Sequence, residues 1–132
     1  MLDNDARVET RDNDGLTPLC FAAKKHRMDA VRALLSAGAY VNTQCNNGIS
    51  ALSMASHEGC IEIVNTLLDN GSQLETRDND GRTALWVAAA TGQTNIVRTL
   101  LSAGADVNTQ QNDGSSAISV AGAIGHVGII RV

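Results

Sequence analysis

The stretch Asp12–Ala23, which reads DNDGLTPLCFAA, decides the fold because its pattern returns every 33 residues along the chain. In each copy a glycine is followed at fixed spacing by threonine or serine, then by leucine or isoleucine, and then by alanine. The glycines are Gly15, Gly48, Gly81 and Gly114, and the alanines are Ala22, Ala55, Ala88 and Ala121. A period of this length, held in several columns, indicates an array of structural repeats.

Each copy predicts two short helices and a turn. Thr17 is a favourable N-cap, and Pro18 suits the first helical position, where its missing N–H costs nothing. A narrow apolar stripe of leucine and alanine follows, and a second apolar stripe comes later at Val31, Leu34 and Leu35. A glycine then ends the second helix. No copy can bury its stripes alone, so the stability must come from stacking.

The column pattern resembles the ankyrin repeat. The resemblance rests on Asp12-x-x-Gly15-x-Thr17-Pro18-Leu19, on Ala22-Ala23, and on Val31-x-x-Leu34-Leu35-x-x-Gly38-Ala39-x-Val41-Asn42. It covers nearly the whole chain and implies an all-α solenoid of stacked helix-turn-helix units with projecting β-turn fingers. Residues 1–132 then form one domain, made of the tail of a preceding repeat (1–11), three repeats with full helix pairs (12–44, 45–77 and 78–110) and a truncated repeat (111–132).

The chain departs from the family pattern at two columns. The histidine of the family's Thr-Pro-Leu-His motif is lost, and with it a hydrogen-bonding link that the family uses between loop and helix. The residues that stand in its place are Cys20, Ser53, Trp86 and Ser119. The glycine that joins the two helices is kept as Gly59, Gly92 and Gly125, but His26 stands there in the first full repeat. The family backbone gives His26 a positive φ, which costs on the order of 1 kcal/mol, so we expect a less stiff array than a consensus one.

A second, stronger match recurs at 66 residues. Glu9–Gly15 reads ETRDNDG, and Glu75–Gly81 repeats it letter for letter. Duplication of a two-repeat block explains this match. A functional interpretation adds that charged fingertips alternate with amide-rich ones at Gln44–Asn47 and Gln110–Asp113, an arrangement that suits an extended partner with charges at matching intervals.

Composition argues against several classes of protein. The net charge is −4 and the pI is about 5.2, so the chain has no overall basic field to hold a nucleic acid. Phe21, Tyr40 and Trp86 are too few aromatic residues for an RNA-stacking module. The apolar stretches fall far short of the roughly 20 residues of a membrane span. Three cysteines cannot pair evenly, which is typical of a reducing compartment. We expect a monomer with no nucleic-acid partner and no membrane insertion, located in the cytoplasm, with the nucleus also open.

The sequence does not indicate an enzyme. The cysteines and the histidines fall at different places in the repeat, and Gly59 breaks the helix between His57 and Cys60. The chain shows no set of zinc ligands at the required spacing and no glycine-rich phosphate cradle. Most carboxylates stand in turns, where aspartate bonds the backbone. We therefore predict a non-catalytic protein with no metal and no cofactor.

Two local features each have two interpretations. The basic cluster Lys24–Arg27 is either a solvated helix end or a contact for an acidic partner. Trp86 either packs beneath the fingertip or forms a binding hot spot.

The resemblance implies a module that binds another protein through a concave face, formed by the fingertips and the first helices. Rigid tips would lose little entropy on binding. The variable positions of this face supply the candidate contacts. They are Arg11, Asn13, Asp14, Leu16, Lys24, Lys25, Gln44, Asn46, Asn47, Ile49, His57, Glu58, Arg77, Asn79, Asp80, Arg82, Ala90, Thr91, Gln110, Asn112 and Asp113.

Two alternative functions stay open. The chain begins inside a repeat and ends on an apolar helix, which suits a passive spacer in the longer array of a channel, enzyme or effector; we then expect hydrogen-exchange protection to be weakest after Gly122. The second alternative is a substrate of an asparaginyl hydroxylase, because the contexts of Asn42 and Asn108 resemble those modified in ankyrin repeats. Stabilisation of the turn is the competing explanation for both asparagines.

Overall fold

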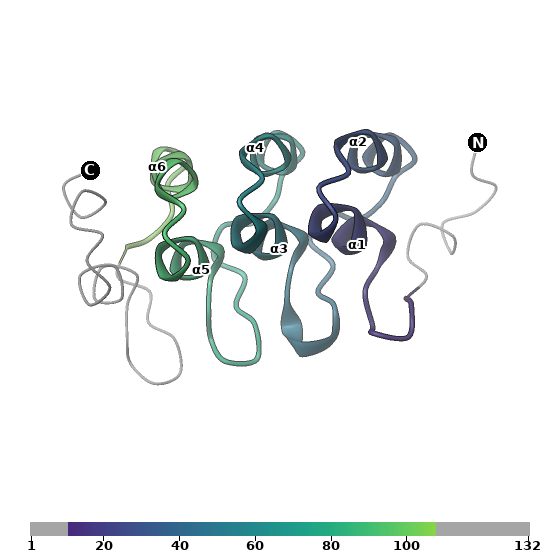
Figure 1. Ribbon diagram of the computed structural model, residues 1–132, viewed down its shortest axis with the longest axis horizontal. Coiled ribbons are helices and arrows are strands. Elements are labelled where there is room, and N and C mark those ends of the chain that lie inside the picture. The colour runs from purple at the N-terminus through teal and green to yellow at the C-terminus, as the bar shows by residue number, and fades with distance from the viewer. Residues whose placement is uncertain (1–10, 108–132) are drawn as a thin grey trace.

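The computed structural model describes residues 11–107, which form a solenoid of three helix pairs (Figure 1). The first helices of the pairs lie in one row, and the second helices lie in a parallel row above them. The fingers, which are the turns that precede each first helix, project from the side of the first row. Each first helix packs on its own second helix, and α3 packs on both α1 and α5. The helices are α1 (Pro18–Lys24), α2 (Met28–Ser36), α3 (Ala51–Glu58), α4 (Ile61–Asp69), α5 (Ala84–Ala90) and α6 (Thr94–Ser102), with a short 3₁₀ helix η2 (Asn46–Gly48).

The first helices begin at the hydroxyl side chains that the sequence predicts as N-caps. The Thr17 hydroxyl oxygen accepts the Cys20 N–H at 3.3 Å, and Ser50 and Thr83 accept equivalent bonds at 3.1 Å and 3.2 Å. All three capping residues are buried. A buried cap matters because it satisfies helix N–H groups that water cannot reach.

The core consists of small and aliphatic side chains stacked from repeat to repeat. Ala22, Ala55 and Ala88 in the first helices are almost fully buried, and so are Val31, Val64 and Val97 in the second helices. Alanine lets the first helices approach closely, which explains a hydrophobic chain with so few aromatic residues. Two of those aromatics, Phe21 and Tyr40, have 45% and 61% of their surface exposed.

The predicted backbone of His26 is confirmed. Its φ is +61°, while Gly59 and Gly92, at the same place in the next two repeats, have φ of +80° and +74°. The helix joint therefore keeps one conformation whether or not the residue has a Cβ, and His26 carries the steric cost of that conformation.

The predicted fold class is confirmed for the residues described. Among them, no helix is long and apolar enough to cross a bilayer. The truncated repeat and the exchange prediction beyond Gly122 lie outside the described residues.

Candidate functional site

A ladder of long side chains joins the bases of successive fingers. Arg11 donates from Nη1 to the Gly15 carbonyl at 3.2 Å and from Nη2 to the Gln44 carbonyl at 2.7 Å. Gln44 Nε2 donates to the Gly48 carbonyl at 2.8 Å and to the Arg77 carbonyl at 2.9 Å. Each side chain thus holds its own finger and the finger of the next repeat, so these exposed candidates also fix the geometry of the face.

In the two charged fingers, an aspartate carboxylate holds the turn by accepting backbone hydrogen bonds. In the first finger, Asp12 Oδ1 accepts the backbone N–H groups of Asp14 and Leu16, both at 2.9 Å. In the third finger, Asp78 Oδ1 does the same for Asp80 and Arg82, again at 2.9 Å. A side-chain oxygen that accepts two backbone donors substitutes for backbone pairing inside a tight turn.

The middle finger closes differently because Cys45 occupies the place of the aspartate. Without a carboxylate to collect the two N–H groups, the chain forms η2, and Asn47 takes a φ of +73°. The backbone bond across the finger is kept: the Cys45 N–H donates to the Ile49 carbonyl at 2.8 Å, as the Asp12 and Asp78 N–H groups donate to the carbonyls four residues later. The 66-residue period therefore corresponds to alternating turn geometry in these three fingers, as well as to alternating tip charge.

The tips themselves are open to solvent. Asn13, Asp14, Asn46, Asn79 and Asp80 are all exposed. The fingers that carry them form a row along the side of the solenoid that projects away from the helices (Figure 1). The row combines carboxylates with amides, which provide both hydrogen-bond donors and acceptors.

Trp86 lies half-buried under its own finger. The Arg82 guanidinium stacks over its ring, 5.3 Å from the ring centroid, and Arg82 also pairs with Asp80 at 3.1 Å. This arrangement favours packing beneath the fingertip, the first of the two interpretations of Trp86.

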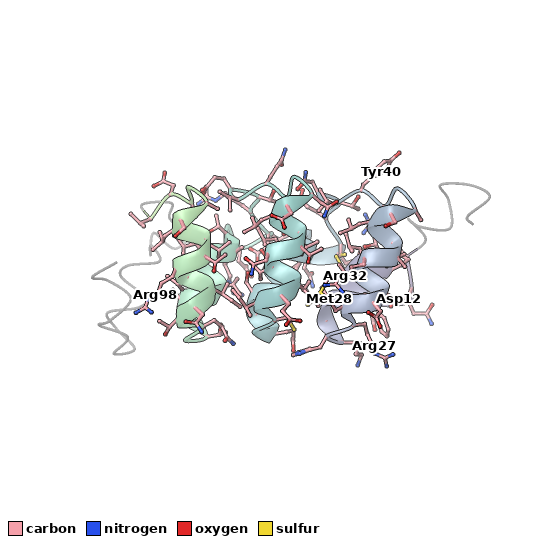
Figure 2. The ribbon with its side chains drawn as sticks, turned by 90° about the horizontal axis from the view of Figure 1, so that it is seen from above. Asp12, Arg27, Met28, Arg32, Tyr40 and Arg98 are labelled. Carbon is pink, nitrogen blue, oxygen red and sulfur yellow. The ribbon has the colours of Figure 1, made fainter. Side chains whose placement is uncertain are left out.

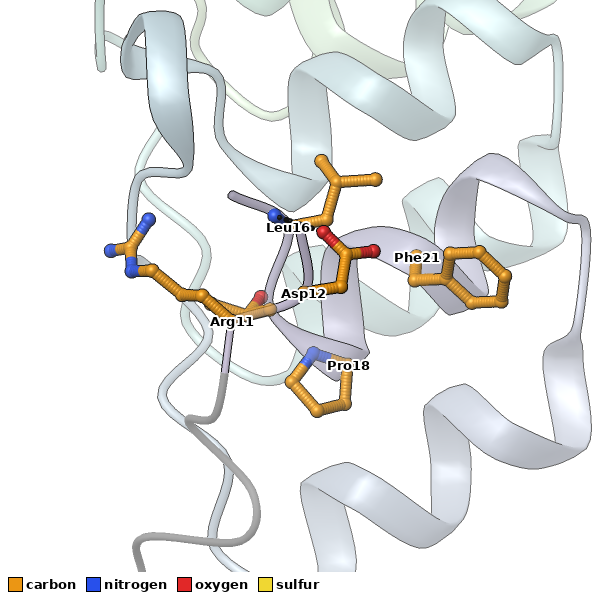
Figure 3. A pocket seen from close by; sticks show the side chains of 6 residues that line it. Arg11, Asp12, Leu16, Pro18 and Phe21 are labelled. Carbon is orange, nitrogen blue, oxygen red and sulfur yellow. Dashed lines mark hydrogen bonds between the residues drawn. The ribbon is translucent and has the colours of Figure 1, made fainter. Parts of the chain in front are cut away.

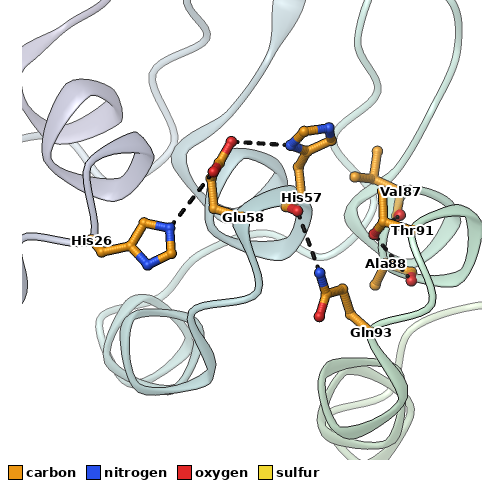
Figure 4. Close-up of polar contacts among 7 residues, drawn as sticks. All are labelled: His26, His57, Glu58, Val87, Ala88, Thr91 and Gln93. Atoms are coloured by element: carbon orange, nitrogen blue, oxygen red, sulfur yellow. Dashed lines mark hydrogen bonds and ion pairs between the residues drawn. The ribbon is translucent and has the colours of Figure 1, made fainter.

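The ends of the first helices carry a small charged cluster (Figure 4). Glu58 accepts from His57 Nδ1 at 3.1 Å and pairs with His26 Nε2 at 3.6 Å. Partial burial acts to raise the pKa of Glu58, but the hydrogen bonds and positive charge of His57 and His26 hold that pKa below its usual range. Gln93 Nε2 donates to the His57 carbonyl at 3.5 Å and so links the second and third repeats.

The basic end of α1 is solvent-exposed. Lys24, Lys25 and Arg27 are all exposed, and Lys25 Nζ lies 5.7 Å from the centroid of the Phe21 ring. Lys24, Lys25 and Arg27 therefore present their charges to solvent.

One candidate contact residue, Leu16, is largely buried. Leu16 is only 8% exposed and belongs to the hydrophobic core, where it lines a pocket with Arg11, Pro18 and Phe21 (Figure 3). The Asp12 carboxylate holds the Leu16 N–H, and the Leu16 side chain packs inward at the end of the turn. Ile49, Glu58, Arg82 and Ala90 are half-buried, and Gln110, Asn112 and Asp113 lie outside the described residues.

Asn42 has a structural role in the turn after α2. Its Nδ2 donates to the Gly71 carbonyl at 3.3 Å, and its Oδ1 accepts the Gln73 N–H at 2.7 Å. One repeat later, Glu75 accepts the Asp106 N–H at 2.8 Å in the same way. These bonds favour turn stabilisation as the reason for the asparagine. Hydroxylation of Asn42 stays a prediction, and Asn108 lies outside the described residues.

The structure brings together two cysteines that sequence reasoning treated separately. Cys20 in α1 and Cys45 at the base of the next finger both contact the Thr17 hydroxyl. The sequence signal that could have found this pair is the repeat register, because stacking places a first helix against the finger of the following repeat. Within residues 11–107, no group of three or more histidine, cysteine or acidic side chains has the arrangement of a metal site.

Comparison with known families agrees with this architecture. The family model for ankyrin repeats matches in three copies, over residues 1–78, 41–111 and 71–132. The chain therefore belongs to the ankyrin repeat family. No curated protein matches it significantly. Ankyrin repeats generally mediate protein–protein interactions, and the family is typically non-catalytic.

Proposed function

We propose that this chain binds another protein through the face made by its fingertips and the ends of its first helices. Membership of the ankyrin repeat family carries the proposal, since that family generally mediates protein–protein interaction. The proposed contacts are the tips Asn13–Asp14, Asn46–Asn47 and Asn79–Asp80, together with the charged helix ends.

The finger ladder supports this choice of face. Because Arg11 and Gln44 tie each finger to the next, the tips are held before a partner arrives. A surface that is already ordered loses less side-chain and loop entropy on association. The ladder residues then act mainly by positioning the tips.

The charge of the first-helix ends changes from repeat to repeat along the proposed binding face. Lys24 and Lys25 place positive charge at the end of α1, Glu58 stands between two histidines at the end of α3, and Ala90–Thr91 offers a small neutral surface at the end of α5. A partner with an acidic segment near the first repeat would complement this order. We further propose that the module acts as a monomer in the cytoplasm or nucleus.

A comparison of two variants with opposite faces altered tests the proposal. The first variant carries alanine at Lys24, Lys25, His57 and Glu58. The matched control carries alanine at Arg32, Arg98, Asn65 and Glu62, which are exposed on the second helices, so it removes the same charges from the other layer (Figure 2). Both variants are first checked for wild-type helical content by circular dichroism.

Quantitative affinity capture from cell extract, followed by titration of each captured protein, gives the readout. We expect a protein captured by the wild type and by the control to bind the first variant at least about tenfold more weakly, since two or more desolvated polar contacts are lost. Equal binding by both variants, or capture of nothing by the wild type, would contradict the proposal and favour the spacer.

A further inference from the structure

We propose that Cys20 and Cys45 form a redox-responsive pair that closes into a disulfide between the first two repeats. This goes beyond protein binding and does not depend on it. The two residues come from different repeats: Cys20 lies in α1, and Cys45 begins the finger that leads to α3.

The two thiols are close enough to hydrogen-bond each other, and Thr17 lies beside both residues. Its hydroxyl oxygen accepts the Cys20 N–H at 3.3 Å and lies 3.9 Å from the Cys45 sulfur. Cys20 and Cys45 are only 1% and 4% exposed, so their contact is shielded from bulk solvent. Cys20 also occupies the column where the family's motif has histidine, so a thiol faces the next finger at that joint.

The surroundings make the two thiols unequal. The contact with Cys20 is the largest cause lowering the pKa of Cys45; burial opposes it, and Thr17 and the positive charge of Arg11 add to the lowering. The same contact and burial raise the pKa of Cys20. The surroundings therefore favour the thiolate at Cys45 over that at Cys20, and the thiolate is the form that reacts with oxidants.

Arg11 is placed to maintain this difference. Its guanidinium is fixed on the Gln44 carbonyl, the residue next to Cys45, by the 2.7 Å bond of the finger ladder. The cation therefore remains beside the Cys45 thiolate as part of the fold.

We take hydrogen peroxide, a small two-electron oxidant, as the co-reactant for these buried thiols. The Cys45 thiolate attacks one peroxide oxygen and breaks the O–O bond, giving the Cys45 sulfenic acid and hydroxide. The Cys20 sulfur then attacks the Cys45 sulfur and displaces its oxygen, which leaves as water together with the Cys20 proton. In total, two thiols lose two electrons and two protons, and one peroxide becomes two waters.

Cys60 provides an internal comparison. It is half-buried at the start of α4, and burial and the charge of Glu58 both raise its pKa. Cys60 therefore lacks the activation that the Cys45 thiolate has. Cys60→Ser removes the third thiol without touching the pair.

The experiment treats the full chain and its Cys60→Ser variant with a small molar excess of peroxide under native conditions. We expect Cys60→Ser to lose both titratable thiols and 2 Da of mass while staying monomeric. In the wild type, trypsin leaves Cys45 and Cys60 in one peptide, so a second cleavage after Glu58 is needed to show that Cys20 is linked to Cys45 and not to Cys60.

Closure should also stabilise the array, because a covalent link across a repeat interface restricts the unfolded chain. We expect oxidised Cys60→Ser to melt at least about 5 °C higher than its reduced form. Cys45→Ser and Cys20→Ser should show neither the mass loss nor the shift on peroxide treatment, provided that circular dichroism shows them folded.

Three outcomes would overturn the inference. The first is that both thiols of Cys60→Ser persist, the second is that oxidation adds oxygen without the loss of 2 Da, and the third is that it yields only dimers linked between chains. Each outcome can be measured with the wild type or with Cys60→Ser. The inference therefore stays testable even if a variant at Cys20 or Cys45 does not fold.

Discussion

His26 keeps a left-handed backbone at a joint where the other two described repeats have glycine. Its φ of +61° places a Cβ close to the following carbonyl, while Gly59 and Gly92 have none. The 3.6 Å ion pair of His26 with Glu58 is solvent-exposed and therefore offsets little of this steric cost.

We expect His26→Gly to raise the free energy of unfolding by about 1 kcal/mol, since glycine adopts this φ without strain. Urea denaturation followed by circular dichroism measures the change. His26→Ala is the control, because it removes the imidazole but keeps the Cβ, and it should bring no gain. A His26→Gly variant no more stable than the wild type would show that the joint relaxes at no cost.

Glu58 ties stability to pH in a defined direction. Because its folded-state pKa is lowered by His57 and His26, the carboxylate contributes stability that is present above its unfolded pKa. That contribution is lost as the pH falls through the lowered, folded-state pKa. Side-chain NMR titration should find the pKa of Glu58 below the ordinary glutamate value, and higher in His57→Ala than in the wild type. Glu62→Gln, on the second-helix layer, should leave the pKa of Glu58 unchanged; no difference between His57→Ala and the wild type would refute the assigned cause.

The first and third fingers are turns held by one aspartate oxygen, and the third finger offers a direct contrast between two nearby aspartates. Asp78 accepts two backbone N–H bonds, while Asp80 makes a surface ion pair with Arg82. Asp78→Ala should cost about 1–2 kcal/mol of unfolding free energy, and Asp80→Ala less than about 0.5 kcal/mol. Equal losses in urea denaturation would mean that the carboxylate does not hold the turn.

Whether the sequence could predict a feature depends on how far apart in the sequence the contacting residues lie. The caps Thr17, Ser50 and Thr83 and the strained joint at His26 follow from residues close in sequence, so the pattern alone could predict them. The ladder of Arg11 and Gln44 and the meeting of Cys20 with Cys45 could not be predicted, because they depend on how side chains reach across one stacked repeat. The burial of Leu16 could not be predicted either, because variability at a family position does not show whether the side chain is exposed.

Stacking gives the array its stability, and the middle second helix lies at its centre. α4 packs against both α2 and α6, and Leu67 within it is fully buried. Leu67→Ala should lower the free energy of unfolding by about 2–5 kcal/mol. Leu34→Ala, at the equivalent half-buried position in α2, should cost clearly less because it removes less buried surface. Equal losses in thermal or urea denaturation would contradict a stability that comes from stacking of neighbours.

The three described repeats present one row of tips and one row of first-helix ends, opposite the layer of α2, α4 and α6 (Figure 1). Protein binding through the tips and first-helix ends is the central claim. It predicts where a bound partner slows amide exchange, independently of which protein that partner is.

Hydrogen-exchange mass spectrometry on the complex with a captured partner tests this claim most directly. The account predicts added protection at the tips around Asn13, Asn46 and Asn79 and at the ends of α1 and α3, with α2, α4 and α6 unchanged. Added protection confined to α2, α4 and α6 would contradict it.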